Sequence, residues 1–167
     1  MITRRNLVTV GGGALALSTL PLSLLAAQTS SLKQAIDSSD LVYLTPIRSD
    51  GSESSCQAEI WFVPQGPDLY IVTATSSWRV SAVKKGLNKA RIWVGDLGQW
   101  RGTDGKYKEL PRLDAHATVV TDSAEHQQIL DLFGSKYPLG WVVYGSRFRD
   151  GLADGTRTMV RYRPTMA

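Results

Sequence analysis

The sequence predicts one mostly β domain, an antiparallel barrel that carries two or three helices. Short segments in which apolar and polar residues alternate are separated by Asp-Gly and Pro/Gly turn signals, as in antiparallel sheets. Only two segments have helical periodicity, and they do not alternate regularly with the strands, which excludes a doubly wound sheet. The 167 residues, 43% of them hydrophobic, are enough for one core and too few for two ordinary domains.

Composition excludes several classes of protein. The formal charge of +4 falls to +2 without Arg4 and Arg5, which lie in a segment predicted to be removed, and the longest basic run after them is Lys84-Lys85. A charge this small predicts no nucleic-acid partner. Cys56 is the only cysteine, which excludes an intramolecular disulfide and a thiolate zinc cluster.

The N-terminus resembles a twin-arginine signal peptide over residues 1–27. Arg4 and Arg5 precede an uncharged stretch, Leu7 to Ala27, and small residues at its end suit cleavage after Ala27. We therefore expect a precursor that uses the twin-arginine export machinery and a periplasmic or secreted mature protein. The alternative is an uncleaved membrane anchor, since 21 uncharged residues are long enough to span a bilayer. This export route carries folded proteins, so it favours a preloaded cofactor.

A polar stretch, residues 28–39, leads into the predicted domain, residues 40–167. Asp50-Gly51 predicts the turn of the first hairpin, because glycine adopts positive φ readily. In the second strand, Cys56, Ala58 and Phe62 fall on the face expected to lie in the core. The expected strands are Leu41–Arg48, Ser55–Val63, Leu69–Thr75, Ala90–Gly95, Tyr107–Leu110, His116–Thr121 and Thr158–Arg163.

Two helices are expected. Val80, Val83 and Leu87 recur at spacings of three and four, which predicts a short amphipathic helix. A second helix is expected from Ser123 to Phe133, with a capping box at Asp122–Glu125 and a stop at Gly134. Residues 145–157, which contain two Asp-Gly pairs, are expected to form a loop.

The residues with the clearest chemistry lie where the third strand meets the first helix. The segment Thr73–Arg79 offers four hydroxyl groups, one guanidinium and the free amides of a helix start, which together suit a phosphate or another anion. Lys84 adds charge one to two turns further on. The alternative is that Ser76 or Ser77 only caps the helix and that Arg79 is a solvated surface charge.

The order of these elements resembles the pyridoxamine 5'-phosphate oxidase-like family of flavin-binding split barrels, over about residues 40 to 164. The resemblance rests on short segments in the right order: Trp61–Val63, Thr73–Arg79, Arg91–Gly95, His116–Asp122, Gly134–Pro138 and Met159–Pro164. It implies an antiparallel split β-barrel of the FMN-binding type, a homodimer, and FMN or a deazaflavin coenzyme as cofactor.

The resemblance also implies a set of cofactor-binding residues. Trp78 and the second-strand residues Glu59, Ile60 and Trp61 stand where many family members carry a basic residue, so this chain has less positive charge there. No catalytic side chain is implied, and His116 and His126 have no metal-ligand spacing with Cys56. The implied binding residues are Thr73, Thr75, Ser76, Ser77, Trp78, Arg79 and Lys84.

Two functions follow from the resemblance and stay open. The first is an exported oxidoreductase that uses FMN or a deazaflavin to act on a small organic acceptor. The second is a non-catalytic flavin- or haem-binding module on the same fold. The twin-arginine motif favours the first, and the missing basic residues favour the second.

Overall fold

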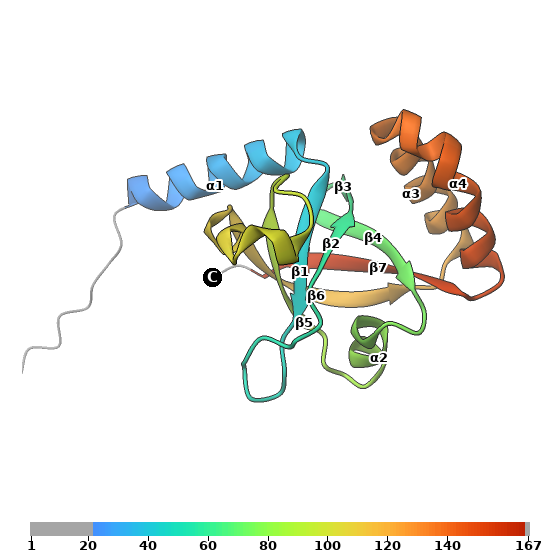
Figure 1. Cartoon of the computed structure of the whole chain (residues 1–167), viewed down its shortest axis with the longest axis horizontal. Helices are drawn as coiled ribbons and strands as arrows, with labels where there is room; N and C mark the ends of the chain where they lie inside the picture. Colours follow the sequence, from blue (N-terminus) through green and yellow to red (C-terminus); the bar gives the residue numbers. More distant parts are fainter. Residues whose placement is uncertain (1–21, 166–167) are drawn as a thin grey trace, which may run out of the picture.

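The computed structural model describes residues 22–165 (Figure 1). Within this range the chain is built on one seven-stranded β-sheet that helices cover. The strands are β1 (Leu41–Pro46), β2 (Ala58–Trp61), β3 (Val63–Gln65), β4 (Asp68–Ala74), β5 (Lys89–Val94), β6 (Arg112–Val120) and β7 (Arg157–Pro164). The helices are α1 (Leu22–Ser38), α2 (Trp78–Lys84), α3 (Ser123–Lys136) and α4 (Pro138–Ala153), with short 3₁₀ helices η1 (Trp100–Thr103) and η2 (Lys106–Glu109).

The sheet is antiparallel throughout and nearly closes on itself. Its strand order is β2-β1-β5-β6-β7-β4-β3. The two edge strands, β2 and β3, are separated in sequence only by Phe62, and they pair with β1 and β4 respectively. One bent segment therefore connects both edges of the sheet, which confirms the predicted antiparallel barrel.

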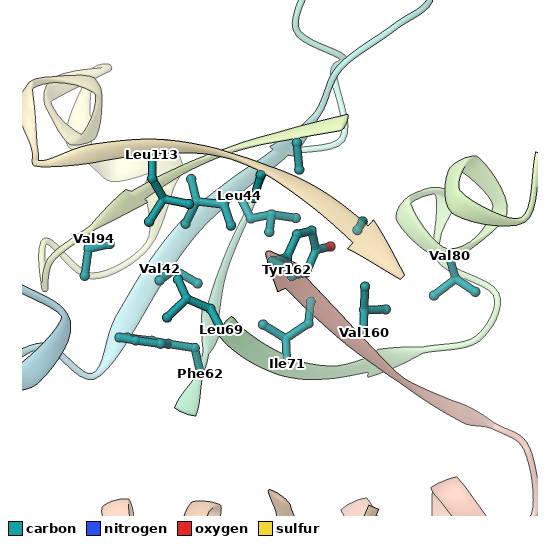
Figure 2. Close-up of a cluster of buried hydrophobic side chains, with 14 residues drawn as sticks. Val42, Leu44, Phe62, Leu69, Ile71, Val80, Val94, Leu113, Val160 and Tyr162 are labelled. Atoms are coloured by element: carbon teal, nitrogen blue, oxygen red, sulfur yellow. The ribbon is translucent and has the colours of Figure 1, made fainter. Parts of the chain in front are cut away.

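The barrel interior is filled by alternate residues of the strands. Along β6, Leu113, Ala115 and Ala117 are buried while Asp114 and His116 are exposed, as expected for a strand with one face in a core. Figure 2 shows aliphatic and aromatic side chains from several strands and from α2 meeting inside the barrel. The side chains labelled there are Val42, Leu44, Phe62, Leu69, Ile71, Val80, Val94, Leu113, Val160 and Tyr162.

A second apolar cluster lies outside the barrel, between the sheet and the helices α3 and α4. Tyr70 and Val72 of β4 face it from the sheet, and Ile129 and Phe133 of α3 are fully buried against them. Half of the capping box predicted for α3 is present, since the Asp122 side chain accepts a hydrogen bond of 2.7 Å from the Glu125 amide. The Glu125 carboxylate accepts from the Tyr70 hydroxyl over 2.9 Å in place of the reciprocal bond to the Asp122 amide.

The predicted end of the second helix and the predicted loop at residues 145–157 are both wrong. α3 continues through Gly134 to Lys136, and α4 occupies most of the expected loop. The glycines at these positions allow close packing of side chains and do not end the helices. A Cβ on Gly134 would lie 3.0 Å from Nε1 of Trp141, and one on Gly145 would lie 2.9 Å from its ring, so both glycines make room for this indole.

Two further predictions are corrected in the loops. Residues 106–109 form η2 and not a strand, because Tyr107 turns inward to stack on Tyr43, with ring centroids 5.1 Å apart. Cys56 is half-buried and precedes β2 instead of lying in a core strand. Its amide donates to Ser54 Oγ over 3.2 Å, so a local turn replaces the expected ladder bond there.

At the N-terminus, residues 28–38 of the predicted polar stretch are helical and belong to α1. Leu32, Ala35 and Ile36 on α1 pack against the barrel cluster. Most of the predicted signal segment, residues 1–21, lies outside the described residues, and α1 runs through the predicted cleavage position after Ala27. Among the helices of residues 22–165, none combines the length and the apolar character that a bilayer span requires.

Candidate functional site

The candidate site is the segment that connects β4 with α2. After β4 ends at Ala74, the Ser77 amide donates to the Ala74 carbonyl over 2.9 Å and closes a tight turn. α2 then begins at Trp78, with Ser77 at the N-cap position. The Ser77 side chain makes no capping hydrogen bond. Although Ser77 occupies the N-cap position, its hydroxyl does not cap the helix, so the geometry does not support the alternative in which Ser77 only caps α2.

Arg79 is buried, and it has no carboxylate partner among the described residues. Its side chain is only 8% exposed, and Nη1 donates to Thr73 Oγ1 over 2.7 Å. Nε is buried and has no hydrogen-bond partner within residues 22–165. Arg79 is therefore not the solvated surface charge of the alternative interpretation. Removing a guanidinium from water without a neutralising group is costly, so an anion that reaches this site would be bound favourably.

Ser77 adds a second unsatisfied group two residues before Arg79. Its Oγ is buried and has no hydrogen-bond partner within the described structure. A hydroxyl and a guanidinium nitrogen are both good donors to phosphate oxygens, and the guanidinium adds the positive charge that a phosphate requires. The two unsatisfied donors and Thr73, which positions the guanidinium, fit the phosphate of a coenzyme.

The remaining predicted residues separate into different roles. The Thr75 hydroxyl donates to the Gly155 carbonyl over 2.7 Å and lies 2.8 Å from Thr158 Oγ1, so it joins the ends of β4 and β7. Ser76 is exposed at the turn. Lys84 is exposed in the last turn of α2, which leaves it outside the cluster of Thr73, Ser77 and Arg79.

Trp78 is the tryptophan whose surroundings suit a planar coenzyme ring. It is 43% exposed and directly follows Ser77. By contrast, Trp61 stacks on Tyr137 and Trp93 packs edge-on against Tyr107, so these rings are already in aromatic contact. An exposed indole beside a phosphate site offers a surface on which a flavin ring can stack.

The surroundings of Tyr162, which Arg79 shares, could not be found from the sequence. Burial raises the pKa of the Tyr162 hydroxyl, the positive charge of Arg79 opposes this rise, and Cys56 adds to it. Arg79 of α2 and Cys56, which precedes β2, therefore each interact electrostatically with Tyr162 of β7. No local pattern indicates this, because Cys56 and Tyr162 are far apart in sequence.

The two histidines lie elsewhere. His116 is exposed on β6 and lines an open pocket of about 440 Å³ together with Lys89 and Arg91. A ring nitrogen of His126 lies 3.0 Å from the Val120 carbonyl oxygen. Over residues 22–165, no group of three or more His, Cys, Asp or Glu side chains is arranged to hold a metal ion.

Known structures resemble this chain in fold, although no family model and no curated protein matches its sequence. HutZ of Vibrio cholerae, described as a haem storage protein, has a TM-score of 0.58 at 15% identity, covering 83% of this chain and 90% of its own. A Clostridium acetobutylicum protein related to general stress protein 26, of the pyridoxine phosphate oxidase family, has a TM-score of 0.52 at 18% identity, covering 83% and 84%.

General stress protein 26 of Bacillus anthracis has a TM-score of 0.51 at 13% identity, covering 81% of this chain and 87% of its own. At these identities the likenesses concern the fold. They show that the chain has the architecture of the pyridoxamine 5'-phosphate oxidase-like split barrels. Proteins of this architecture include one described as a haem storage protein, so the fold alone does not select a cofactor.

Proposed function

We propose that this split barrel binds a phosphate-bearing flavin coenzyme, FMN or a deazaflavin, at the segment Thr73–Arg79. The observation that carries the proposal is Arg79, a buried guanidinium without a carboxylate partner in the described structure, two residues after Ser77, whose hydroxyl is also unsatisfied. Such an arrangement is unfavourable when empty and favourable when an anion completes it.

Each residue of the segment has its own part in the proposal. Arg79 and Ser77 donate to the coenzyme phosphate, and Thr73 holds the guanidinium through the bond from Nη1. Trp78 offers an exposed ring beside the phosphate. Thr75 keeps the ends of β4 and β7 together and so fixes the turn in which Ser77 lies. Lys84 contributes charge at a longer range.

An oxidoreductase that acts on a small organic acceptor is the activity we propose. The coenzyme, when bound, would supply the redox chemistry by accepting and donating a hydride or electrons. The protein would anchor the phosphate, position the ring and limit the access of water, so no side chain has to act as a nucleophile.

A haem-binding module is the second candidate, and it depends on a different part of the barrel. His116 is exposed in the pocket that also contains Lys89 and Arg91. An imidazole is a common iron ligand, and lysine and arginine side chains pair with carboxylates such as the haem propionates. HutZ, which shares the fold, is described as a haem storage protein.

One absorption spectrum separates these candidates. The protein purified from its native source should show the flavin or deazaflavin bands, and the coenzyme should be released on denaturation. A Soret band instead would select the haem-binding alternative. A colourless protein that takes up neither FMN, a deazaflavin nor haem would contradict both.

We also propose that the precursor is exported by the twin-arginine route and that the mature protein begins near Gln28. Support comes from Arg4 and Arg5 ahead of the uncharged stretch. If both arginines are replaced by lysine, the precursor should stay in the cytoplasm. An unchanged yield of periplasmic protein would contradict the proposed route, and an intact N-terminal segment in the membrane fraction would favour an anchor over cleavage.

A further inference from the structure

A pocket of about 280 Å³ opens beside the C-terminal half of α4, at the ends of β4 and β7. We call it the α4 pocket; its lining includes Ala74 of β4, Arg147 and Gly151 of α4, and Arg157 of β7. Successive side chains of a strand point to opposite faces. Because Thr73 faces Arg79, its neighbour Ala74 faces away from the proposed coenzyme phosphate, and the α4 pocket lies on the other side of β4.

The α4 pocket brings two like charges together. Arg147 and Arg157 both line it, and no carboxylate of the described residues lies within ion-pair distance of either guanidinium. Burial lowers the pKa of Arg157, and the positive charge of Arg147 lowers it further. The two guanidiniums are therefore close enough to repel each other, and an anion between them would remove that repulsion.

Arg157 is held in place by α4. A Cβ on Gly151 would lie 2.7 Å from Cγ of Arg157, so the arginine side chain rests on the helix where only glycine leaves room for it. Its Cζ lies 5.3 Å from the centroid of the Phe148 ring, a cation–π contact. A guanidinium fixed in this way loses little conformational entropy when it binds an anion.

The two acidic residues of the α4 pocket do not neutralise the arginines. Oδ1 of Asp154 accepts hydrogen bonds from the Thr156 amide, over 2.8 Å, and from Thr156 Oγ1, over 2.7 Å. The Asp154 carboxylate is therefore already engaged in hydrogen bonds within the turn that precedes β7. Asp150 is exposed on α4 and forms no ion pair within residues 22–165. Its negative charge opposes anion binding, and the opposition grows with the charge of the ligand, so the pocket suits a single small anionic group better than a polyanion.

We propose that the α4 pocket binds one small oxyanion group, a phosphate or a carboxylate, between Arg147 and Arg157. Both groups accept paired hydrogen bonds from guanidinium nitrogens. The volume suits the head of a small ligand better than a whole coenzyme. This site is independent of the coenzyme proposal, since it uses other residues on the opposite face of β4.

The test is a titration of the full chain with inorganic phosphate and, separately, with acetate. The reporters are the Nε–Hε NMR signals of Arg147 and Arg157, which distinguish this pocket from binding at Arg79. These signals should shift saturably with phosphate, acetate or both, and the ligand that binds more tightly identifies the chemistry of the natural group. Arg147→Gln should weaken binding roughly ten- to a hundredfold.

Arg149→Gln is the matched control, because Arg149 is also exposed on α4 but lies over the Trp141 ring, at 5.7 Å, outside the pocket. It should bind the anion as the wild type does. Without any anion, Arg147→Gln should leave the thermal midpoint unchanged or slightly raised, since it removes a repulsion. The proposal is overturned if neither anion shifts the signals saturably, if both variants lose affinity equally, or if Arg147→Gln lowers the midpoint.

Discussion

The positively charged side chain of Arg79 is buried. Within the described part of the chain it forms a hydrogen bond with one hydroxyl group and no ion pair with a carboxylate. The hydrogen-bond donors of this segment were predictable from the sequence, because several serines and threonines followed by an arginine at a strand-to-helix junction form a local pattern that indicates an anion site. It could not predict which donors would remain free. Thr75 is engaged by Gly155 and Thr158, and these contacts come from β7 and the turn before it, more than 75 residues away.

Lys136 gives a second residue-scale prediction. Its Nζ is buried 3.5 Å from the centroid of the Phe62 ring, and no described residue forms a hydrogen bond with it. Burial lowers the pKa of Lys136 to about 8, and Asp40 and Asp96 oppose the shift. Because the pKa in the unfolded chain is higher, near 10.5, the unfolded chain binds more protons between about pH 8 and 10.5. Stability from this group therefore rises as pH rises through that window.

Lys136→Met should accordingly stabilise the protein at pH 7, where the buried amine is charged, by about 1 kcal/mol after allowance for its partial solvation. The gain should shrink towards pH 10, where the amine is neutral in the native protein. Thermal unfolding at both pH values measures this, with Lys85→Met on the exposed end of α2 as control. A gain of equal size at both pH values would refute the assignment.

At the scale of elements, the strands were predictable because their residues alternate and their turns contain Asp-Gly or Pro/Gly. The α3–α4 hairpin was not predictable, because in a single sequence its glycines indicate the end of a helix or a loop. Only the packed structure shows that Trp141 occupies the space beside Gly134 and Gly145. The same limit applies to η2, where an aromatic contact with Tyr43 overrides the strand character of Tyr107 and its neighbours.

Gly145→Ala tests this explanation of the helical glycines. Its Cβ would lie 2.9 Å from the Trp141 ring, which is itself packed against Phe133 and Phe148, so we expect a loss of about 1–2 kcal/mol despite the better helix propensity of alanine. Gly102→Ala is the matched control, since nothing lies within 4 Å of its added Cβ. Urea unfolding of both variants compares them, and equal stability of the two would contradict the packing role.

At the scale of the whole molecule, α4 carries an apolar stripe that no other described element covers. Leu139 is 87% exposed and Val142 is 86% exposed, and Val143 and Tyr144 beside them are exposed too. Exposed apolar residues at spacings of three and four on one helix face are typical of an interface. We propose that the chain forms a homodimer, as the resemblance to flavin-binding split barrels implies, and that a second copy covers this stripe in a two-fold arrangement.

Val142→Glu should therefore shift the protein from dimer to monomer, because a two-fold interface would bring two buried carboxylates together. Sedimentation at micromolar concentration measures the change. Val142 is almost fully exposed in the single chain, so the substitution should leave the thermal midpoint of the monomer unchanged. A wild type that sediments only as a monomer, or a variant that remains dimeric, would exclude this surface as the interface.

The central claim is that Thr73–Arg79 binds a coenzyme through its phosphate, and the comparison of FMN with riboflavin tests it most directly. Riboflavin has the same ring and lacks the phosphate, so calorimetric titration of both ligands isolates the contribution of Arg79 and Ser77. The wild type should bind FMN roughly ten- to a hundredfold more tightly than riboflavin. Arg79→Gln should abolish that preference and leave riboflavin affinity unchanged, while Lys85→Gln should keep it. An Arg79→Gln variant that still prefers FMN as strongly as the wild type would contradict the claim.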